Sequence, residues 1–222
     1  MVYDKEKFHS VIAKGLFIGN RSRPDILTTI SVLSSRVKVP NKDDWLKARR
    51  LVHYLKETKD IHLILKYDAT RINRWHVDAS FTVHEDFRSH SGGLMKISEE
   101  GGVIAAGSTK QKLNVRSSTV AKLVAVDDFL SKIMWISRFL EVLGYPLKQN
   151  VLLQDNTSAI LMQKNGRTCL GKRNRAIDVR YFAIKDLIDK GEVCIEYCDT
   201  ENMIADFKPN LCKGKSSYDL EK

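Results

Sequence analysis

The spacing of apolar residues changes abruptly near Asp68–Thr70, and this change limits the folds open to the chain. Upstream, apolar residues recur at steps of three and four, which is typical of amphipathic helices. The segment 45–55 is the clearest case. Downstream, short runs of alternating apolar and polar residues are typical of β-strands. The chain is therefore predicted to hold a helical segment at residues 1–68, a sheet-containing domain at 69–214 and a tail at 215–222.

The order of the predicted elements indicates the fold class. Consecutive strands, followed by strands that alternate with helices, are typical of a mixed sheet with helices packed on it. Helices are predicted at residues 8–18, 26–33, 45–55, 117–143, 157–164, 177–189 and 201–207, and strands at 62–67, 75–78, 92–97, 103–106, 151–155 and 192–197. We therefore expect an α/β domain preceded by a small helical segment.

The charge of the chain favours an anionic partner. It has 37 basic and 27 acidic residues and a net charge of +10, and cations that neutralise phosphates release counterions from nucleic acid. No apolar run reaches the roughly eighteen residues of a membrane span, and the first residues lack the apolar core of a signal peptide. The four cysteines show no zinc-finger spacing. These features predict a cytoplasmic or nuclear protein with no membrane partner.

Three aspartates stand at places where a scaffold could gather them. Asp78 and Asp155 end predicted strands, and Asp206 lies in the last predicted helix. Hard divalent cations prefer oxygen ligands, and two-metal phosphoryl chemistry needs several carboxylates around ions about 3.5–4 Å apart. Taken singly, each acid fits a helix cap or a solvated surface charge better. The spacing alone therefore does not define a site.

A set of short motifs around these acids resembles the C-terminal part of copia-type retrotransposon Pol polyproteins. The motifs keep the family's order and cover about residues 8–214. In the predicted sheet domain they are Val77-Asp78-Ala79-Ser80, a Ser-x-Ser-Gly-Gly turn at Ser89-His90-Ser91-Gly92-Gly93, Ser108-Thr109-Lys110-Gln111-Lys112, Arg116-Ser117-Ser118-Thr119, Gln154-Asp155-Asn156-Thr157-Ser158-Ala159-Ile160, Asp178-Val179-Arg180-Tyr181-Phe182 and Gly191-Glu192-Val193. Upstream, Arg23-Pro24-Asp25-Ile26, Ser31-Val32-Leu33-Ser34 and Trp45-Leu46-Lys47-Ala48 resemble the segment that joins the polymerase to the ribonuclease domain.

This resemblance implies a ribonuclease-H-like fold, namely a five-stranded mixed sheet with flanking helices. It also implies metal-dependent cleavage of the RNA strand of an RNA–DNA hybrid. Asp78, Asp155 and Asp206 would be the catalytic ligands of Mg²⁺ or Mn²⁺, and Asn156 would lie beside the hybrid. Residues 1–68 would be the connection that follows the reverse transcriptase. The polymerase part of the polyprotein would then precede Met1, and no polymerase activity is expected from this chain.

One departure from the family falls at the centre of this chemistry. The family opens its main helix with Ser-Ser-Thr-Glu-Ala-Glu, whereas this chain has Ser117-Ser118-Thr119-Val120-Ala121-Lys122, so Lys122 replaces the essential glutamate. An ammonium is no ligand for magnesium and repels the ion. Ala176 also stands where the family has histidine, and the ending after Asp206 is two residues shorter than the family's. We therefore expect lost or much reduced cleavage; the alternative is an active, metal-dependent hybrid ribonuclease.

A basic segment next to Asp155-Asn156 offers a binding role that survives loss of cleavage. Residues 163–177 contain no acid, and they contain Lys164, Arg167, Lys172, Arg173 and Arg175. Asn165-Gly166 and Gly171 predict a loop here. A loop that is simply solvated is equally compatible with this composition, but its place in the chain favours contact with phosphates. The predicted partner is an RNA–DNA hybrid or duplex nucleic acid.

Overall fold

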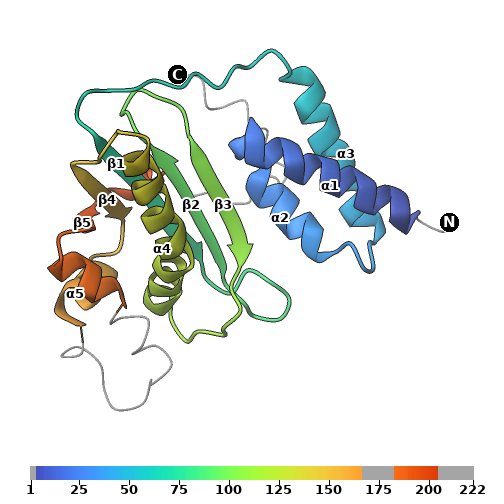
Figure 1. Cartoon of the computed structure of the whole chain (residues 1–222). Coiled ribbons are helices and arrows are strands. Elements are labelled where there is room, and N and C mark those ends of the chain that lie inside the picture. Colours follow the sequence, from blue (N-terminus) through green and yellow to red (C-terminus); the bar gives the residue numbers. More distant parts are fainter. Residues whose placement is uncertain (1–3, 167–182, 205–222) are drawn as a thin grey trace. The chain divides into compact units, whose positions relative to one another are not determined.

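The computed structural model describes residues 4–166 and 183–204. The chain divides near Ile64 into two compact units, which are coloured along the sequence in Figure 1. Within the described residues the first unit is helical and the second contains a sheet. None of the helices in these residues has the length and apolar character needed to cross a membrane.

Three helices form the first unit, at the places that the apolar spacing predicts. They are α1 (Lys5–Arg21), α2 (Leu27–Ser35) and α3 (Lys42–Glu57), with a 3-10 turn η1 (Pro24–Ile26) between the first two. Side chains fix the helix starts: Asp4 accepts from the backbone of Lys7 at 3.0 Å, and Asn41 and Asp44 form a reciprocal capping box. The apolar faces meet in one core, made of Phe8, Ile12, Ile26, Ile30, Leu33, Ala48 and Leu51.

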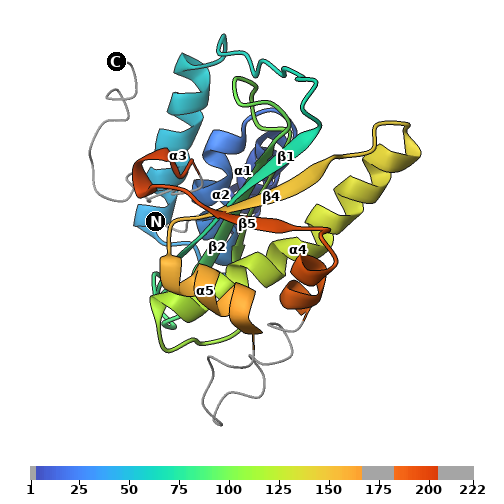
Figure 2. The ribbon, with the colours of Figure 1, turned by 90° about the vertical axis from the view of Figure 1, so that its left-hand side faces the viewer.

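The second unit is built on a five-stranded sheet whose strands lie in the order β3-β2-β1-β4-β5, as Figure 2 shows for its central strands. The strands are β1 (Ile72–Ser80), β2 (His90–Lys96), β3 (Ala105–Lys110), β4 (Gln149–Gln154) and β5 (Cys194–Tyr197). Strands β1, β2 and β3 pair antiparallel, whereas β4 runs parallel to both β1 and β5. The mixed five-stranded sheet implied by the resemblance is confirmed.

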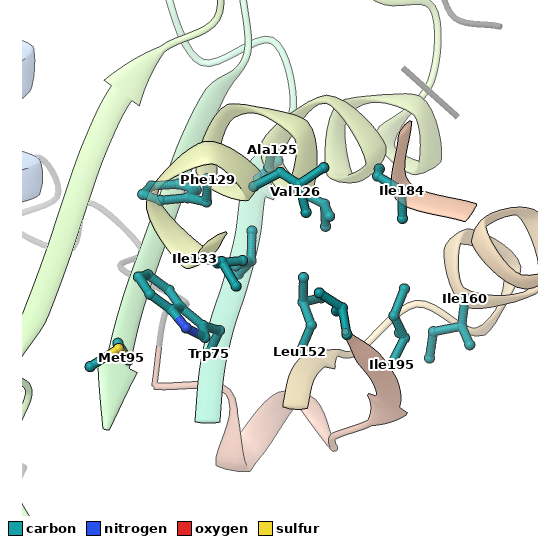
Figure 3. Close-up of a cluster of buried hydrophobic side chains, with 14 of the residues drawn as sticks. Trp75, Met95, Ala125, Val126, Phe129, Ile133, Leu152, Ile160, Ile184 and Ile195 are labelled. Carbon is teal, nitrogen blue, oxygen red and sulfur yellow. The ribbon is translucent and has the colours of Figure 1, made fainter. Parts of the chain in front are cut away.

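Helices α4 (Ser118–Val142) and α5 (Thr157–Asn165) flank this sheet. Figure 2 shows α4 running across the strands, and side chains from α4 point at the sheet in Figure 3. Its Val126, Phe129 and Ile133 pack in one buried cluster with Trp75 of β1 and Leu152 of β4. Residues two apart in a strand point to the same face of the sheet. In β1, Trp75, Val77 and Ala79 therefore share the face that α4 covers. The helices therefore cover the apolar side of the central strands.

Three sequence expectations about local structure are wrong. The predicted strand at 62–67 is not a strand; these residues have no regular structure and carry exposed apolar side chains such as Ile64 and Tyr67. They span the division between the two units. An alternating pattern becomes a strand only where a neighbouring edge accepts its hydrogen bonds, and the sheet pairs its five strands without this segment. The predicted helix at 201–207 begins instead with a 3-10 turn η3 (Thr200–Asn202), and its end lies outside the described residues.

The Ser-x-Ser-Gly-Gly motif is also not a turn, since it runs into strand β2. Its glycines serve close packing instead. Gly93 of β2 lies directly opposite Gly107 of β3, and the ring of Phe129 covers both. A Cβ added at Gly93 would meet the ring at 2.8 Å, and one at Gly107 would meet it at 2.6 Å. The absence of both side chains lets α4 settle onto the sheet.

We expect Gly107→Ala to destabilise the fold by about 1–3 kcal/mol, because the new methyl overlaps a buried ring that has little room to move. Chemical denaturation measures the change in the free energy of unfolding. The matched control is Gly144→Ala, where nothing lies within 4 Å of an added Cβ; its cost comes only from its positive φ of 81°. Combining Gly107→Ala with Phe129→Leu should cost less than the sum of the two single changes. Strict additivity would contradict the packing argument.

Candidate carboxylate site

Two of the three predicted aspartates are brought together by the parallel pairing of β1 with β4. Asp78 lies near the end of β1, opposite Gly92 of β2, and Asp155 follows the last residue of β4. Because the two strands run parallel, their carboxyl ends meet at the same edge of the sheet. The fully buried Gln154 fixes this edge by donating its side-chain amide to the carbonyl of Val77 at 3.0 Å.

Lys122 reaches this edge from the first turns of α4. Ser117 caps the helix by accepting from the backbone of Val120 at 3.2 Å. Gln111, which is buried, then ties the helix to the sheet: its side-chain amide donates to the carbonyl of Ala121 at 2.8 Å and to the hydroxyl of Ser91 in β2 at 2.9 Å. The residue next to Lys122 is therefore held in place by hydrogen bonds, and the flexible lysine stem needs to span only the last few ångströms.

The ammonium of Lys122 lies between the two carboxylates. Its Nζ is 2.9 Å from Oδ1 of Asp78 and donates a short hydrogen bond to Oδ1 of Asp155. The side chains are only 12%, 11% and 10% exposed for Lys122, Asp78 and Asp155 respectively. The other oxygen of Asp155, Oδ2, accepts from the hydroxyl of Thr200 at 3.5 Å. Four chain segments thus meet at one largely buried ionic cluster.

The electrostatics of the cluster favour a charged lysine. Burial opposes the charge on Lys122, but the hydrogen bonds and charges of Asp155 and Asp78 outweigh it, so that the pKa of Lys122 is raised. Burial raises the pKa of Asp78 above its ordinary value, and the ammonium of Lys122 offsets part of this rise. The cluster is therefore held by one cation shared between two acids.

The carboxylates in the described part of the chain do not fit a two-metal centre. In residues 4–166 and 183–204, no group of three or more histidine, cysteine, aspartate or glutamate side chains is placed to hold an ion. The nearest candidate is the Asp78–Asp155 pair, and its central position is taken by Nζ of Lys122. At about 4 Å and an effective dielectric constant near 20, that ammonium would repel a divalent ion by roughly 8 kcal/mol.

The other predicted site residues are placed as follows. Asn156 caps α5, its side-chain oxygen accepting from the backbone of Ala159 at 3.0 Å, and Lys164 is exposed in the last turn of the same helix. At 1.5 Å per residue these two lie about 12 Å apart along the axis. Asp206 and the remaining cations of the basic segment, Arg167, Lys172, Arg173 and Arg175, lie outside the described residues. Their roles in metal or nucleic-acid binding stay predictions.

Sequence reasoning missed two residues that shape this site. Gln111 belongs to one of the family-like motifs, but nothing in its sequence neighbourhood indicates that its amide holds both β2 and α4. Thr200 follows the last strand and contacts Asp155 across 45 positions of the chain. The sequence around a threonine or glutamine in a polar stretch does not indicate such a contact, because the partner residue is distant in sequence and comes close only in the folded chain.

The strand order β3-β2-β1-β4-β5, with β4 parallel to β1 and helices packed on the sheet, is that of the ribonuclease-H-like fold that the motifs imply. No protein-family model matches the chain. Among solved structures, it is similar to LC11-RNase H1, isolated from compost by a metagenomic approach, with 14% identity over 61% of this chain and 91% of that one and a TM-score of 0.44. It is also similar to the RNase H domain of the foamy virus PFV, with 12% identity over 58% of this chain and 79% of that one and a TM-score of 0.39.

In sequence, the chain is similar to retrotransposon Pol polyproteins, as its motifs predicted. It is 28% identical over 217 residues, or 94% of its length, to the Pol polyprotein from transposon TNT 1-94 of Nicotiana tabacum. It is 28% identical over 83% of its length to that of transposon RE2 of Arabidopsis thaliana, and 27% identical over 91% to the Ty1-NL2 Gag-Pol polyprotein of Saccharomyces cerevisiae. These matches span 16%, 13% and 12% of the respective polyproteins.

Proposed function

We propose that this chain is a degenerate ribonuclease-H-like domain that binds RNA–DNA hybrid or duplex nucleic acid without cleaving it efficiently. The observation that carries the proposal is the ammonium of Lys122 between Asp78 and Asp155. Hydrolysis of a phosphodiester by two metal ions requires carboxylates that are free to hold them. In this chain the same carboxylates neutralise a lysine.

Binding rests on features that do not involve the carboxylates. The chain has a net charge of +10, and non-specific binding to nucleic acid depends mainly on neutralising phosphates. The basic segment from Lys164 to Arg175 begins at the end of α5, the helix that starts beside Asp155. We propose that these cations contact the phosphates of a bound hybrid.

The helical unit fits a supporting role. We propose that residues 1–68 correspond to the connection that follows the polymerase part of a Pol polyprotein, and that 69–214 form the ribonuclease-H-like domain. The helical unit has a core of its own, in which the rings of Phe8 and Trp45 meet edge to face with their centroids 5.3 Å apart. This core supports the proposal that the helices fold as one unit. Its partners would be the polymerase part of such a polyprotein and the nucleic acid that both parts hold.

Hybrid binding should depend steeply on salt and on the basic segment. Changing Lys172, Arg173 and Arg175 together to glutamine is expected to flatten the slope of log affinity against log salt by up to about three, because each lost phosphate contact removes close to one unit. Fluorescence anisotropy with a labelled hybrid at several salt concentrations measures the slope.

The matched control changes Arg49, Arg50 and Lys56, three exposed cations of α3, to glutamine. This control alters net charge equally and should change the slope less. Equal slopes for both triple variants and the unmodified chain would reject the basic segment as the binding surface. If the unmodified chain cleaved the hybrid rapidly in magnesium, the alternative of an active ribonuclease would replace the proposal.

A further inference from the structure

We propose that the ammonium of Lys122 permanently takes the place of a divalent ion between Asp78 and Asp155, so that the ribonuclease-H-like domain folds and keeps these two acids together without metal. This inference concerns the same carboxylates as the proposed function and rests on it only for the idea that they no longer serve cleavage. The separate point is that the charges of the two carboxylates are neutralised by a lysine of the same chain rather than by a bound metal ion.

The first step is the position of the two acids. Both contact one nitrogen, so their Oδ1 atoms lie within about 6 Å of each other, a separation at which like charges repel strongly. Both side chains are about nine-tenths buried, which removes most of the water that would screen them. A pair of carboxylates held in this way needs a cation between them.

The second step is how firmly the cation is held. Lys122 belongs to the backbone of α4, whose first turns are tied to β2 through Gln111. A tethered ammonium is present at high effective concentration beside its partners, whereas a free ion must be drawn from solution. The lysine therefore excludes divalent ions at ordinary millimolar concentrations. Taking it away should leave two buried acids that recruit an ion instead.

The test is thermal unfolding in the absence of nucleic acid, with EDTA or with up to 10 mM Mg²⁺, Mn²⁺ or Ca²⁺. The midpoint of the unmodified chain should be the same in all four buffers. In EDTA, Lys122→Met should unfold about 5–15 °C lower, because it keeps the stem and removes the charge. Manganese should raise the midpoint of Lys122→Met saturably, and adding Asp155→Asn to this variant should remove that rise.

Two further variants are matched controls. Lys66→Met removes an ammonium from an exposed ion pair with Glu100 in the same unit, so its midpoint should change little and should not respond to metal. Lys122→Arg keeps a cation and should also remain insensitive to metal.

Either of two results would overturn the inference. One is a saturable metal-induced rise in the midpoint of the unmodified chain that Asp155→Asn abolishes. The other is a Lys122→Met variant that is as stable in EDTA as the unmodified chain. If Lys122→Met does not fold, the unmodified chain and Lys122→Arg still decide between the two possibilities. Since no nucleic acid is present, failure here leaves hybrid binding untouched, and failure of hybrid binding leaves this result standing.

Discussion

In magnesium buffer, Lys122→Glu is expected to cleave the RNA strand of an RNA–DNA hybrid at least tenfold faster than the unmodified chain, which should remain near background. The change replaces a charge that repels the ion with a carboxylate that can bind it, at a position already directed at Asp78 and Asp155. A labelled-hybrid cleavage assay measures the rate, and calorimetry with Mn²⁺ measures the gain in metal affinity.

The control for this gain is Val120→Glu. It adds the same carboxylate to the same helix, but two residues away the side chain points about 200° around the axis and misses the cluster. Val120→Glu should therefore stay near background. Rapid cleavage by the unmodified chain that Asp155→Asn abolishes would contradict the assignment of Lys122 as the inactivating residue. A Lys122→Glu variant that bound no additional metal would do so as well.

Acidification should destabilise the sheet unit through two buried histidines. Burial, with smaller contributions from Lys96 and Arg74, lowers the pKa of His76 to about 4. Burial, followed by the charges of His84 and Lys110, lowers the pKa of His90 to about 4. Each of these two residues is only 6% exposed. His90 lies in a hydrogen-bonded chain, 3.0 Å from His84 and 2.7 Å from the hydroxyl of Ser108.

The sign follows from the unfolded state, in which histidine has a pKa near 6.5. Between pH 6.5 and about 4, these histidines bind protons in the unfolded chain but not in the folded chain. The free energy of unfolding is therefore highest above pH 6.5 and falls as the pH decreases. Each histidine contributes at most about 3 kcal/mol to this loss. Asp78 acts in the opposite direction, because burial raises its pKa and its protonation is easier in the folded state.

Urea unfolding at pH 7, 6, 5 and 4.5 tests this dependence. His76→Gln combined with His90→Gln should flatten the loss between pH 6.5 and 4.5, although it lowers stability at pH 7. The control is His62→Gln, which changes an exposed histidine and should leave the profile of the parent chain. An unaltered profile in the double variant would show that other groups cause the acid sensitivity.

Most of the helices in the described residues were predictable because capping residues mark their ends locally. Helix α4 was expected at 117–143 and runs from Ser118 to Val142, since Ser117 supplies the cap and Gly144 adopts a φ of 81° that ends the helix. The segment 62–67 has an equally clear local pattern, yet it forms no strand. Its fate depends on which sheet edge is free, and that is a property of the whole fold.

For the candidate site, sequence alone supplied residue types and the resemblance supplied their grouping. The replacement of the family's glutamate by Lys122 was visible in one motif. That its ammonium contacts both acids depends on the register of β1 with β4 and on the anchoring of α4 by Gln111. The residues near Lys122 indicate neither the strand register nor the anchoring of α4. The contacts of the ionic cluster could therefore not be predicted from the sequence.

The parallel pairing of β1 with β4 also has a consequence for the order of folding. Strands β1, β2 and β3 are joined by short connections and can pair soon after collapse, whereas the hydrogen bond between Gln154 and Val77 closes a loop of 77 residues. Closing a loop of that length costs entropy before any contact repays it, and such non-local pairings slow folding. We therefore expect Asp155 to reach Asp78 later in folding than β1, β2 and β3 pair with one another. Until then water hydrates the carboxylates of Asp78 and Asp155, and they repel each other strongly only once β1 and β4 have paired.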